Sequence, residues 1–148
     1  METANLKIAI IGAGNMGGAI ARGLSKGTLI APKNIRVSDV SQANLQAISE
    51  FNSEIKVSKS NYETVSDADI VVLALKPWLV EVVAQEIEHR LDYKKQIIVS
   101  IAAGIDLNKM AEYFDTKATM FRVIPNTGID VLQSVSTISS YNASAEQE

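Results

Sequence analysis

Three closely spaced glycines near the amino terminus constrain this chain more than any other feature. The segment Gly12-Ala13-Gly14-Asn15-Met16-Gly17 has the spacing G-x-G-x-x-G, and the largely apolar residues 7–11 lead directly into it. Ala19, Ile20 and Leu24 follow it as the apolar residues of a helix. A tight connection between a strand and a helix needs glycine wherever one backbone passes close to another. The sequence therefore predicts a strand, a glycine turn and a helix over about residues 16–26.

This turn is typical of proteins that bind dinucleotides. Gly12 would permit the tight turn, Gly14 would let a pyrophosphate approach the backbone, and Gly17 would let the helix lie close to the strand. The amides at the start of the helix offer hydrogen-bond donors and a partial positive charge to the phosphates. The alternative is a structural turn without a ligand, but the strand-turn-helix context favours the dinucleotide.

Short apolar runs alternate with amphipathic segments along most of the chain. We expect strands over residues 6–11, 35–38, 55–57, 70–75, 96–101, 118–123 and 134–140. Further helices are expected from a cap at Ser41 to Phe51, over residues 80–91, and from Asp106 to about Phe114. Lys76-Pro77 should end the strand that precedes it. The order predicts an α/β fold: a Rossmann-type, doubly wound, mostly parallel sheet with helices on both faces.

Length and composition narrow the class of protein. The 148 residues are enough for one domain, here a single NAD(P)-binding domain over residues 1–148. A net charge of −3 argues against a nucleic-acid partner, and the absence of cysteine excludes disulfides, thiolate nucleophiles and sulfur-ligated metals. We expect no metal site. Residues 1–5 lack the features of a signal peptide, and no apolar run reaches the roughly 18 residues of a membrane span. We therefore expect a cytoplasmic protein without a membrane partner.

Asp39 bears on the choice of cofactor. It stands 22 positions after Gly17, where an acidic residue would hold the adenosine ribose hydroxyls. A carboxylate there repels a 2′-phosphate, which favours NADH over NADPH. Ser38 and Ser41 could instead donate hydrogen bonds to a phosphate, although no arginine occurs between residues 37 and 45. The alternative interpretation is that Asp39 is a turn or cap residue.

Four segments together resemble the amino-terminal half of pyrroline-5-carboxylate reductases. They are the glycine turn, Leu73-Ala74-Leu75-Lys76-Pro77, Ser100-Ile101-Ala102-Ala103-Gly104-Ile105 and Arg122-Val123-Ile124-Pro125-Asn126-Thr127. They occur in the family's order, each at the carboxyl end of an expected strand. The resemblance covers nearly the whole chain.

The resemblance implies reduction of 1-pyrroline-5-carboxylate to proline with NADPH or NADH, the last step of proline biosynthesis. It implies that the segments from Ala74 to Pro77 and from Ala102 to Gly104 flank the nicotinamide half of the cofactor. Asn126 and Thr127 would lie near the nicotinamide and the substrate entrance. Asn61 matches a family residue near the adenosine ribose. The small-molecule substrate is a cyclic imine that arrives protonated, so orientation matters more than a strong acid.

Few side chains are candidates for catalysis. Lys76 is a candidate electrostatic partner of the substrate, or it shapes the turn before Pro77. His89, the only histidine, is expected on a solvated helix surface. Trp78 is interpreted as a packing residue, and Asp67 and Asp69 as a solvated turn.

The chain departs from the family in two ways. Gly128 stands where the family has proline after the Pro-Asn-Thr segment. The family's reductases also carry a second, helical domain that forms the dimer and supplies much of the substrate site. That domain is absent from this sequence, so we expect the chain alone to bind dinucleotide with little or no turnover, and to form homo-oligomers only with that domain. The alternatives are a non-catalytic dinucleotide-binding module and a related imine or β-hydroxyacid dehydrogenase.

Overall fold

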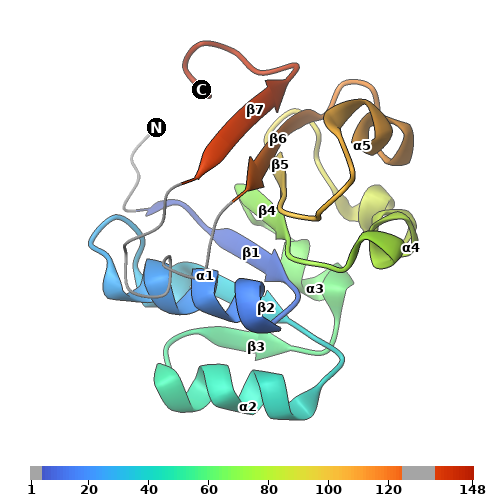
Figure 1. Ribbon diagram of the computed structural model, residues 1–148. Coiled ribbons are helices and arrows are strands. Elements are labelled where there is room, and N and C mark those ends of the chain that lie inside the picture. Colours follow the sequence, from blue (N-terminus) through green and yellow to red (C-terminus); the bar gives the residue numbers. More distant parts are fainter. Residues whose placement is uncertain (1–4, 125–135) are drawn as a thin grey trace.

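The computed structural model describes residues 5–124 and 136–148, and one mixed sheet forms its centre. The strands are β1 (Ile8–Ile11), β2 (Ile35–Ser38), β3 (Lys56–Ser58), β4 (Ile70–Leu73), β5 (Ile97–Ser100), β6 (Thr119–Ile124) and β7 (Thr137–Tyr141). They lie in the order β3-β2-β1-β4-β5-β6-β7, and only the β6–β7 pair is antiparallel (Figure 1). This is the Rossmann-type, mostly parallel sheet that the sequence predicts. Because the strand order reverses at β1, a crevice for ligands is expected at the carboxyl ends of β1 and β4.

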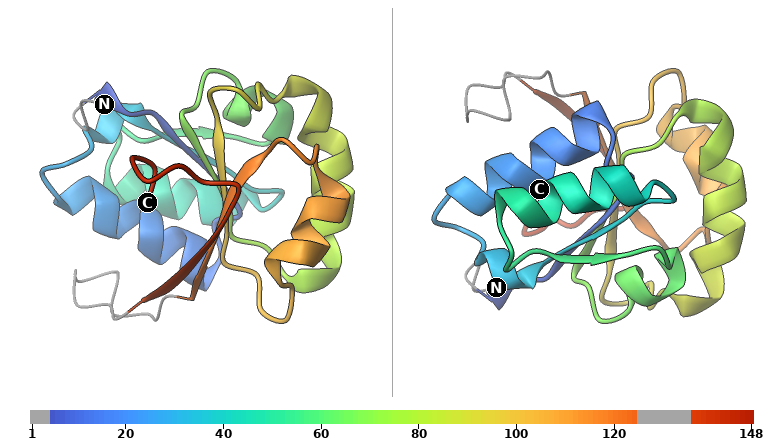
Figure 2. Two further views of the ribbon diagram at one scale, coloured as in Figure 1. Left: turned by 90° about the horizontal axis from the view of Figure 1, so that it is seen from above. Right: turned by 90° about the horizontal axis from the view of Figure 1, so that it is seen from below.

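Helices cover the two faces of the sheet unequally (Figure 2). The helices are α1 (Asn15–Lys26), α2 (Gln42–Phe51), α3 (Asn61–Val65), α4 (Pro77–Ile87) and α5 (Leu107–Tyr113), with short 3₁₀ turns η2 (Pro32–Asn34) and η3 (Glu88–Arg90). Helices α1 and α2 contribute Ile20, Ala21 and Ile48 to one apolar cluster, whereas α3, α4 and α5 contribute their buried apolar side chains to another. No helix in the described part of the chain is long and apolar enough to span a bilayer.

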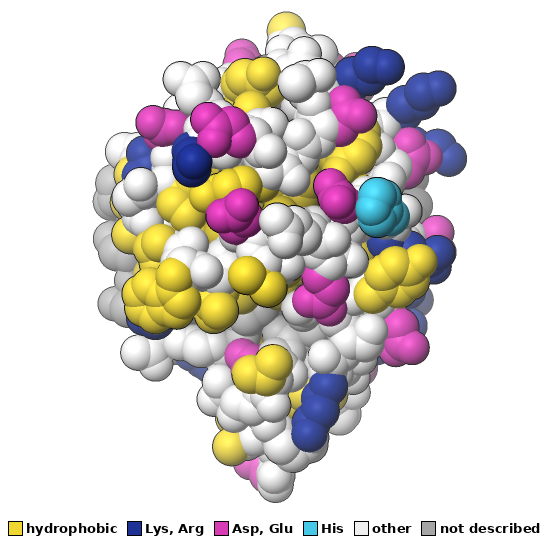
Figure 3. All heavy atoms as spheres, turned by 90° about the vertical axis from the view of Figure 1, so that its right-hand side faces the viewer, with side chains coloured by type: hydrophobic (Ala, Val, Ile, Leu, Met, Phe, Trp, Pro, Cys, Tyr) yellow, Lys and Arg dark blue, Asp and Glu magenta, His cyan; other side chains and the backbone are white. Residues whose placement is uncertain are grey.

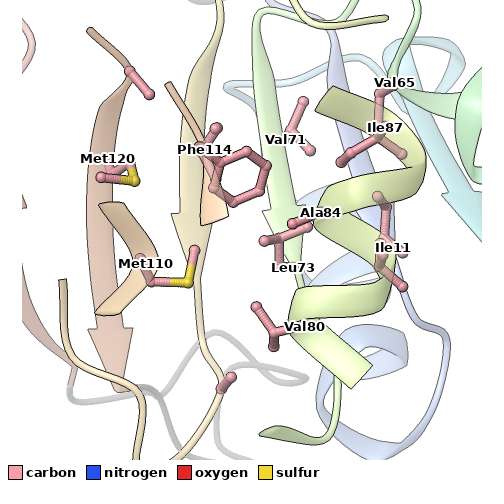
Figure 4. Packing of buried hydrophobic residues seen from close by; sticks show 14 of the residues in the cluster. Ile11, Val65, Val71, Leu73, Val80, Ala84, Ile87, Met110, Phe114 and Met120 are labelled. Atoms are coloured by element: carbon pink, nitrogen blue, oxygen red, sulfur yellow. The ribbon is translucent and has the colours of Figure 1, made fainter. Parts of the chain in front are cut away.

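The central strands β1 and β4 are largely buried on both faces, as parallel strands between helices should be. Ala9 and Ile11 point into the cluster under α3–α5, whereas Ile8 and Ile10 point into the cluster under α1 and α2. On the α4 side, buried residues from β1, α3, β4, α4, β5, α5 and β6 form one cluster, part of which is shown in Figure 4. The labelled members of that cluster are Ile11, Val65, Val71, Leu73, Val80, Ala84, Ile87, Met110, Phe114 and Met120.

Single capping residues set several helix boundaries. The Ser41 hydroxyl accepts from the Asn44 amide at 3.3 Å and caps α2, and Asp106 Oδ1 accepts from the Lys109 amide at 2.8 Å and caps α5. Both caps confirm the sequence prediction. The short α3 was not predicted. Its cap is Ser60, whose hydroxyl accepts from the Glu63 amide.

The prediction for residues 70–91 was wrong in detail. Strand β4 ends at Leu73 instead of residue 75, and α4 begins at Pro77 instead of residue 80. Pro77 is the first residue of the helix, where its missing N–H costs nothing and its fixed φ suits the helix. The helix ends at Ile87, and η3 follows it. Pro77 therefore begins α4, in addition to preventing β4 from continuing.

Gln96 is a buried polar residue that joins two loops at the amino ends of the strands. Its side chain is 6% exposed, and its Nε2 donates to the carbonyls of Val65 and Ala68 at 2.8 and 2.7 Å. Its Oε1 accepts from the Asp92 amide at 2.7 Å. All three hydrogen-bonding groups of the amide are therefore used.

We expect Gln96→Ala to lower the free energy of unfolding by about 2–4 kcal/mol, because it leaves buried backbone groups without partners. Gln46→Ala is the matched control. It removes an exposed hydrogen bond from Gln46 to Glu50 and should change the free energy by about 0.5 kcal/mol or less. Urea denaturation of both variants measures the difference. Equal losses would show that the Gln96 hydrogen bonds do not contribute specifically.

Candidate dinucleotide-binding site

The glycine turn between β1 and α1 is held by close backbone packing. Gly12 has φ +104°, and a Cβ built there would lie 2.2 Å from the Ala74 carbonyl oxygen. A Cβ on Gly17 would lie 1.9 Å from the Gly12 carbonyl oxygen. The Gly12 amide donates to the Ser38 carbonyl at 2.8 Å. Gly12 and Gly17 are therefore required by the protein itself.

Gly14 is different, because nothing in the described part of the chain requires glycine there. It is exposed, its φ is −72°, and a Cβ would meet no atom within 4 Å. It is also the N-cap of α1, which has no side-chain cap and no acidic residue in its first turn. The first amides of α1 therefore have no side-chain cap, and a cofactor pyrophosphate fits the cradle that they form. Ala13, Asn15 and Met16 line the same turn.

Asp39 joins this turn to the loop that follows β2. Its Oδ2 accepts from the Ala13 amide at 2.7 Å and its Oδ1 from the Ser41 amide at 2.7 Å. The Asn44 side chain also approaches Oδ2 at 3.4 Å. Asp39 is half-buried, so two backbone amides hold its carboxylate in one position beside the expected adenosine ribose.

A chain of side chains continues from β2 to α4. The hydroxyl of Ser38, which is fully buried, donates to Asn61 Oδ1 at 2.7 Å, and Asn61 Nδ2 donates to Glu86 Oε2 at 3.1 Å. The Ser38 hydroxyl is therefore bonded to Asn61 and does not lie at the open surface. Asn61, the first residue of α3, is the member of this pair that lies nearer to solvent.

The carboxyl ends of β4 and β5 bear the segments that the resemblance assigns to the nicotinamide. The Ala74 amide donates to the Ile11 carbonyl at 2.8 Å, which ties this end of β4 to β1. The Ser100 hydroxyl accepts from the Ala102 amide at 3.2 Å. Ala103 and Gly104 are exposed, and Gly104 has φ +74°. Asn126 and Thr127, like Gly128, lie outside the described residues.

The comparisons with known proteins agree with this geometry. Residues 7–104, which include every contact just described, match a family described as NADP oxidoreductase, coenzyme F420-dependent. The chain belongs to this family.

Its similarity to pyrroline-5-carboxylate reductases extends over nearly its whole length. It is 34% identical to pyrroline-5-carboxylate reductase 3 of Danio rerio over 143 residues, which are 97% of this chain and 49% of that protein. Against the Methanosarcina acetivorans pyrroline-5-carboxylate reductase the identity is 34% over 134 residues, or 90% and 49% of the two chains. The chain thus spans about half the length of the curated relatives that it matches.

Solved structures give the same result. A Plasmodium falciparum pyrroline carboxylate reductase with NADP bound aligns with a TM-score of 0.85 at 26% identity, covering 99% of this chain and 52% of that one. A Coxiella burnetii pyrroline-5-carboxylate reductase aligns with a TM-score of 0.88 at 27% identity, covering 98% and 53%. A Mycobacterium tuberculosis 3-hydroxyisobutyrate dehydrogenase, at 16% identity, covers 90% and 46% with a TM-score of 0.71 and shares the fold alone.

The two side chains considered for catalysis, Lys76 and His89, lie in different parts of the structure. Lys76 is exposed and precedes α4, and its carbonyl accepts from the Leu79 amide at 2.9 Å, so its backbone shapes this turn. His89 is exposed on η3, on the side of the molecule seen in Figure 3. Both residues are at the surface, but only Lys76 belongs to a segment that the resemblance assigns to the cofactor.

Two interpretations of side chains are corrected. Trp78 is 73% exposed in the first turn of α4, so it is not a packing residue. The prediction rested on the apolar character of the Trp78 side chain, which does not show that the first turn of α4 is exposed. Asp67 is exposed with φ 65°, as expected for a turn, but Asp69 is half-buried and its Oδ2 accepts from the Lys7 amide at 2.8 Å. Asp69 therefore attaches the start of the chain to β4.

Gly14 and Gly17 of the turn give opposite expectations. Gly17→Ala should destabilise the fold by about 3 kcal/mol or more, since its Cβ has no space against the Gly12 carbonyl. Gly14→Ala should leave the free energy of unfolding within about 1 kcal/mol, yet weaken dinucleotide binding by about tenfold or more. Urea denaturation and titration with NADH measure the two effects. Undiminished NADH binding by a folded Gly14→Ala variant would show that the phosphates bind elsewhere.

Proposed function

We propose that this chain is the cofactor-binding half of a pyrroline-5-carboxylate reductase, which reduces 1-pyrroline-5-carboxylate to L-proline with NADH or NADPH. The open cradle at Gly14, with Asp39 held beside it, is the observation that carries the proposal. The similarity to reductases of this name over nearly the whole chain supports the choice of substrate.

The residues of this chain would act by binding and orientation. The turn from Gly12 to Gly17 would hold the pyrophosphate, and Asp39 with Asn61 would hold the adenosine ribose. The segments Ala74–Pro77 and Ala102–Gly104, together with Asn126 and Thr127, would hold the nicotinamide end, which supplies the hydride. The hydride adds to the carbon of a protonated C=N bond, whose electron pair moves to nitrogen, so no further proton is needed in that step. Lys76 would contribute a positive charge near the carboxylate of the substrate.

We further propose that the site prefers NADH. The Asp39 carboxylate accepts two backbone amides at 2.7 Å and would lose both if it swung aside for a 2′-phosphate. Its negative charge therefore stays where that phosphate would lie, and like charges at short distance repel. The NADP-bound relative shows that its own site accepts the phosphate. The preference of this chain thus depends on Asp39.

Asp39→Asn tests this preference, because it keeps an acceptor and removes the charge. We expect the affinity for NADPH to rise about tenfold or more relative to that for NADH. Asp106→Asn, at the cap of α5, is the matched control and should leave the ratio unchanged. Parallel titrations followed by Trp78 fluorescence measure both. An unaltered ratio in Asp39→Asn would mean that Asp39 only shapes the turn.

Turnover should require more than this chain. We propose that a helical domain, as in the family's reductases, completes the substrate site and forms the dimer. The 148-residue chain should bind NADH but oxidise it at most slowly when 1-pyrroline-5-carboxylate is added. The decrease in NADH absorbance, measured at a saturating NADH concentration, decides this. Rapid oxidation that depends on the substrate would refute the need for a second domain, and failure to bind NADH would refute the proposed cofactor role itself.

A further inference from the structure

One face of β6 and β7, next to β5, lacks a covering helix among the described residues. Strand register shows which side chains share it: Val99 is opposite Phe121, and Val123 is opposite Ile138. Val99 packs against the cluster under α1 and α2, which identifies the side of the sheet. Of the described helices only α5 packs closely on β6, and it belongs to the other side. We call the surface formed by Val99, Ile101, Phe121, Val123 and Ile138 the open face.

The open face becomes more exposed toward the edge of the sheet. Phe121 is 9% exposed and Val123 is half-buried, whereas Ile138 on β7 is 67% exposed. Edge strands usually carry charged residues or proline that keep other chains away. Thr137–Tyr141 has neither. An apolar face on an unprotected edge strand indicates a surface that another element covers.

The chain turns away from the sheet directly after β7. Asn142 has φ 55°, a left-handed conformation that asparagine tolerates better than most residues. Its Nδ2 donates to the Lys117 carbonyl at 3.0 Å, and its own carbonyl accepts from the Thr119 hydroxyl at 3.1 Å. These bonds fix the direction of the turn. The last residues then lie on the side of the sheet that bears α1 and α2 (Figure 2).

Residues 144–148 have the hydrogen bonds of a helix start. The Ser144 amide donates to Gln147 Oε1 at 2.9 Å, and the Gln147 amide donates to the Ser144 hydroxyl at 3.3 Å. This reciprocal pair is a capping box. The Glu148 amide donates to the Ser144 carbonyl at 3.1 Å, which is a bond of α-helical spacing. Glu146 and Glu148 also place negative charge where the helix dipole favours it.

A side-chain contact places this turn over the open face. Ser140 is opposite Phe121 in the register, so its side chain lies on the open face. Its hydroxyl donates to Glu148 Oε1. We propose that the open face is the docking surface of an amphipathic helix whose first turn is Ser144–Glu148 and which continues along the chain. Its apolar side would cover Val123 and Ile138, and its polar side would face the solvent.

The test uses the whole chain extended past Glu148 by three further helical turns built from Ala, Leu, Glu and Lys. In one version the leucines lie on the side facing the sheet, and in the other the same residues are scrambled around the helix. We expect the patterned extension to raise Tm by about 5 °C or more and to protect the amides of β7 from hydrogen exchange. The scrambled extension should do neither.

Two substitutions show whether the open face causes the gain. Ile138→Lys should abolish the gain in Tm, whereas Leu29→Lys, at a residue that is equally 67% exposed, should preserve it. Both substitutions should have little effect on the unextended chain, because both side chains are mostly exposed. An equal gain in the Ile138→Lys variant, or no gain from the patterned extension, would overturn the proposal. Dimerisation of the unextended chain that Ile138→Lys abolishes would also overturn it, since a second copy would then be the occupant.

Discussion

The close approach of α1 to β1 and β4 is the contact on which the cofactor site depends. Gly17 lies against the Gly12 carbonyl and Gly12 against the Ala74 carbonyl, each at a distance that leaves no space for a Cβ. This packing brings the amino end of α1 to the point where the strand order reverses. The proposed phosphate binding depends on that position, because the first amides of a helix have no partners within the helix and can donate to an anion there. At Gly14 a Cβ would meet no described atom within 4 Å, and this is the residue through which we propose that the same turn contacts a ligand.

In the proposed site, Asp39 connects the phosphate-binding turn with the position of the adenosine ribose. A half-buried carboxylate is stabilised when it accepts hydrogen bonds from backbone amides. The amides of Ala13 and Ser41 belong to two different loops, so the same bonds that satisfy the charge also fix the spacing of the loops. The proposed cofactor preference and the geometry of the two loops therefore depend on the same side chain. The carboxylate of Asp39 is therefore held more firmly than its position in a loop would suggest.

Local sequence signals predicted most helices and strands of this fold. Features that depend on contacts between residues far apart in the sequence could not be predicted in this way. Ser41 and Asp106 each cap a helix through bonds within three residues, so their helices were located correctly. The five-residue α3 is too short to show a helical period. The position of Asp39 followed from its spacing to Gly17, but its bond to Ala13 spans 26 residues and has no local pattern. The exposure of Trp78 depends on how α4 leaves the sheet, which composition does not record.

The two halves of the sheet differ in how fully helices cover their faces. The proposed adenosine site lies on the half that is covered more fully. The backbone and side-chain bonds that shape the adenosine half of the site all lie within residues 11–86, around β1, β2 and β4. These strands have helices on both faces. Strands β6 and β7 are covered on one face only among the described residues. In the proposed site, the adenosine half therefore lies on strands that are covered on both faces, whereas the nicotinamide end would border β5 and β6, next to the open face.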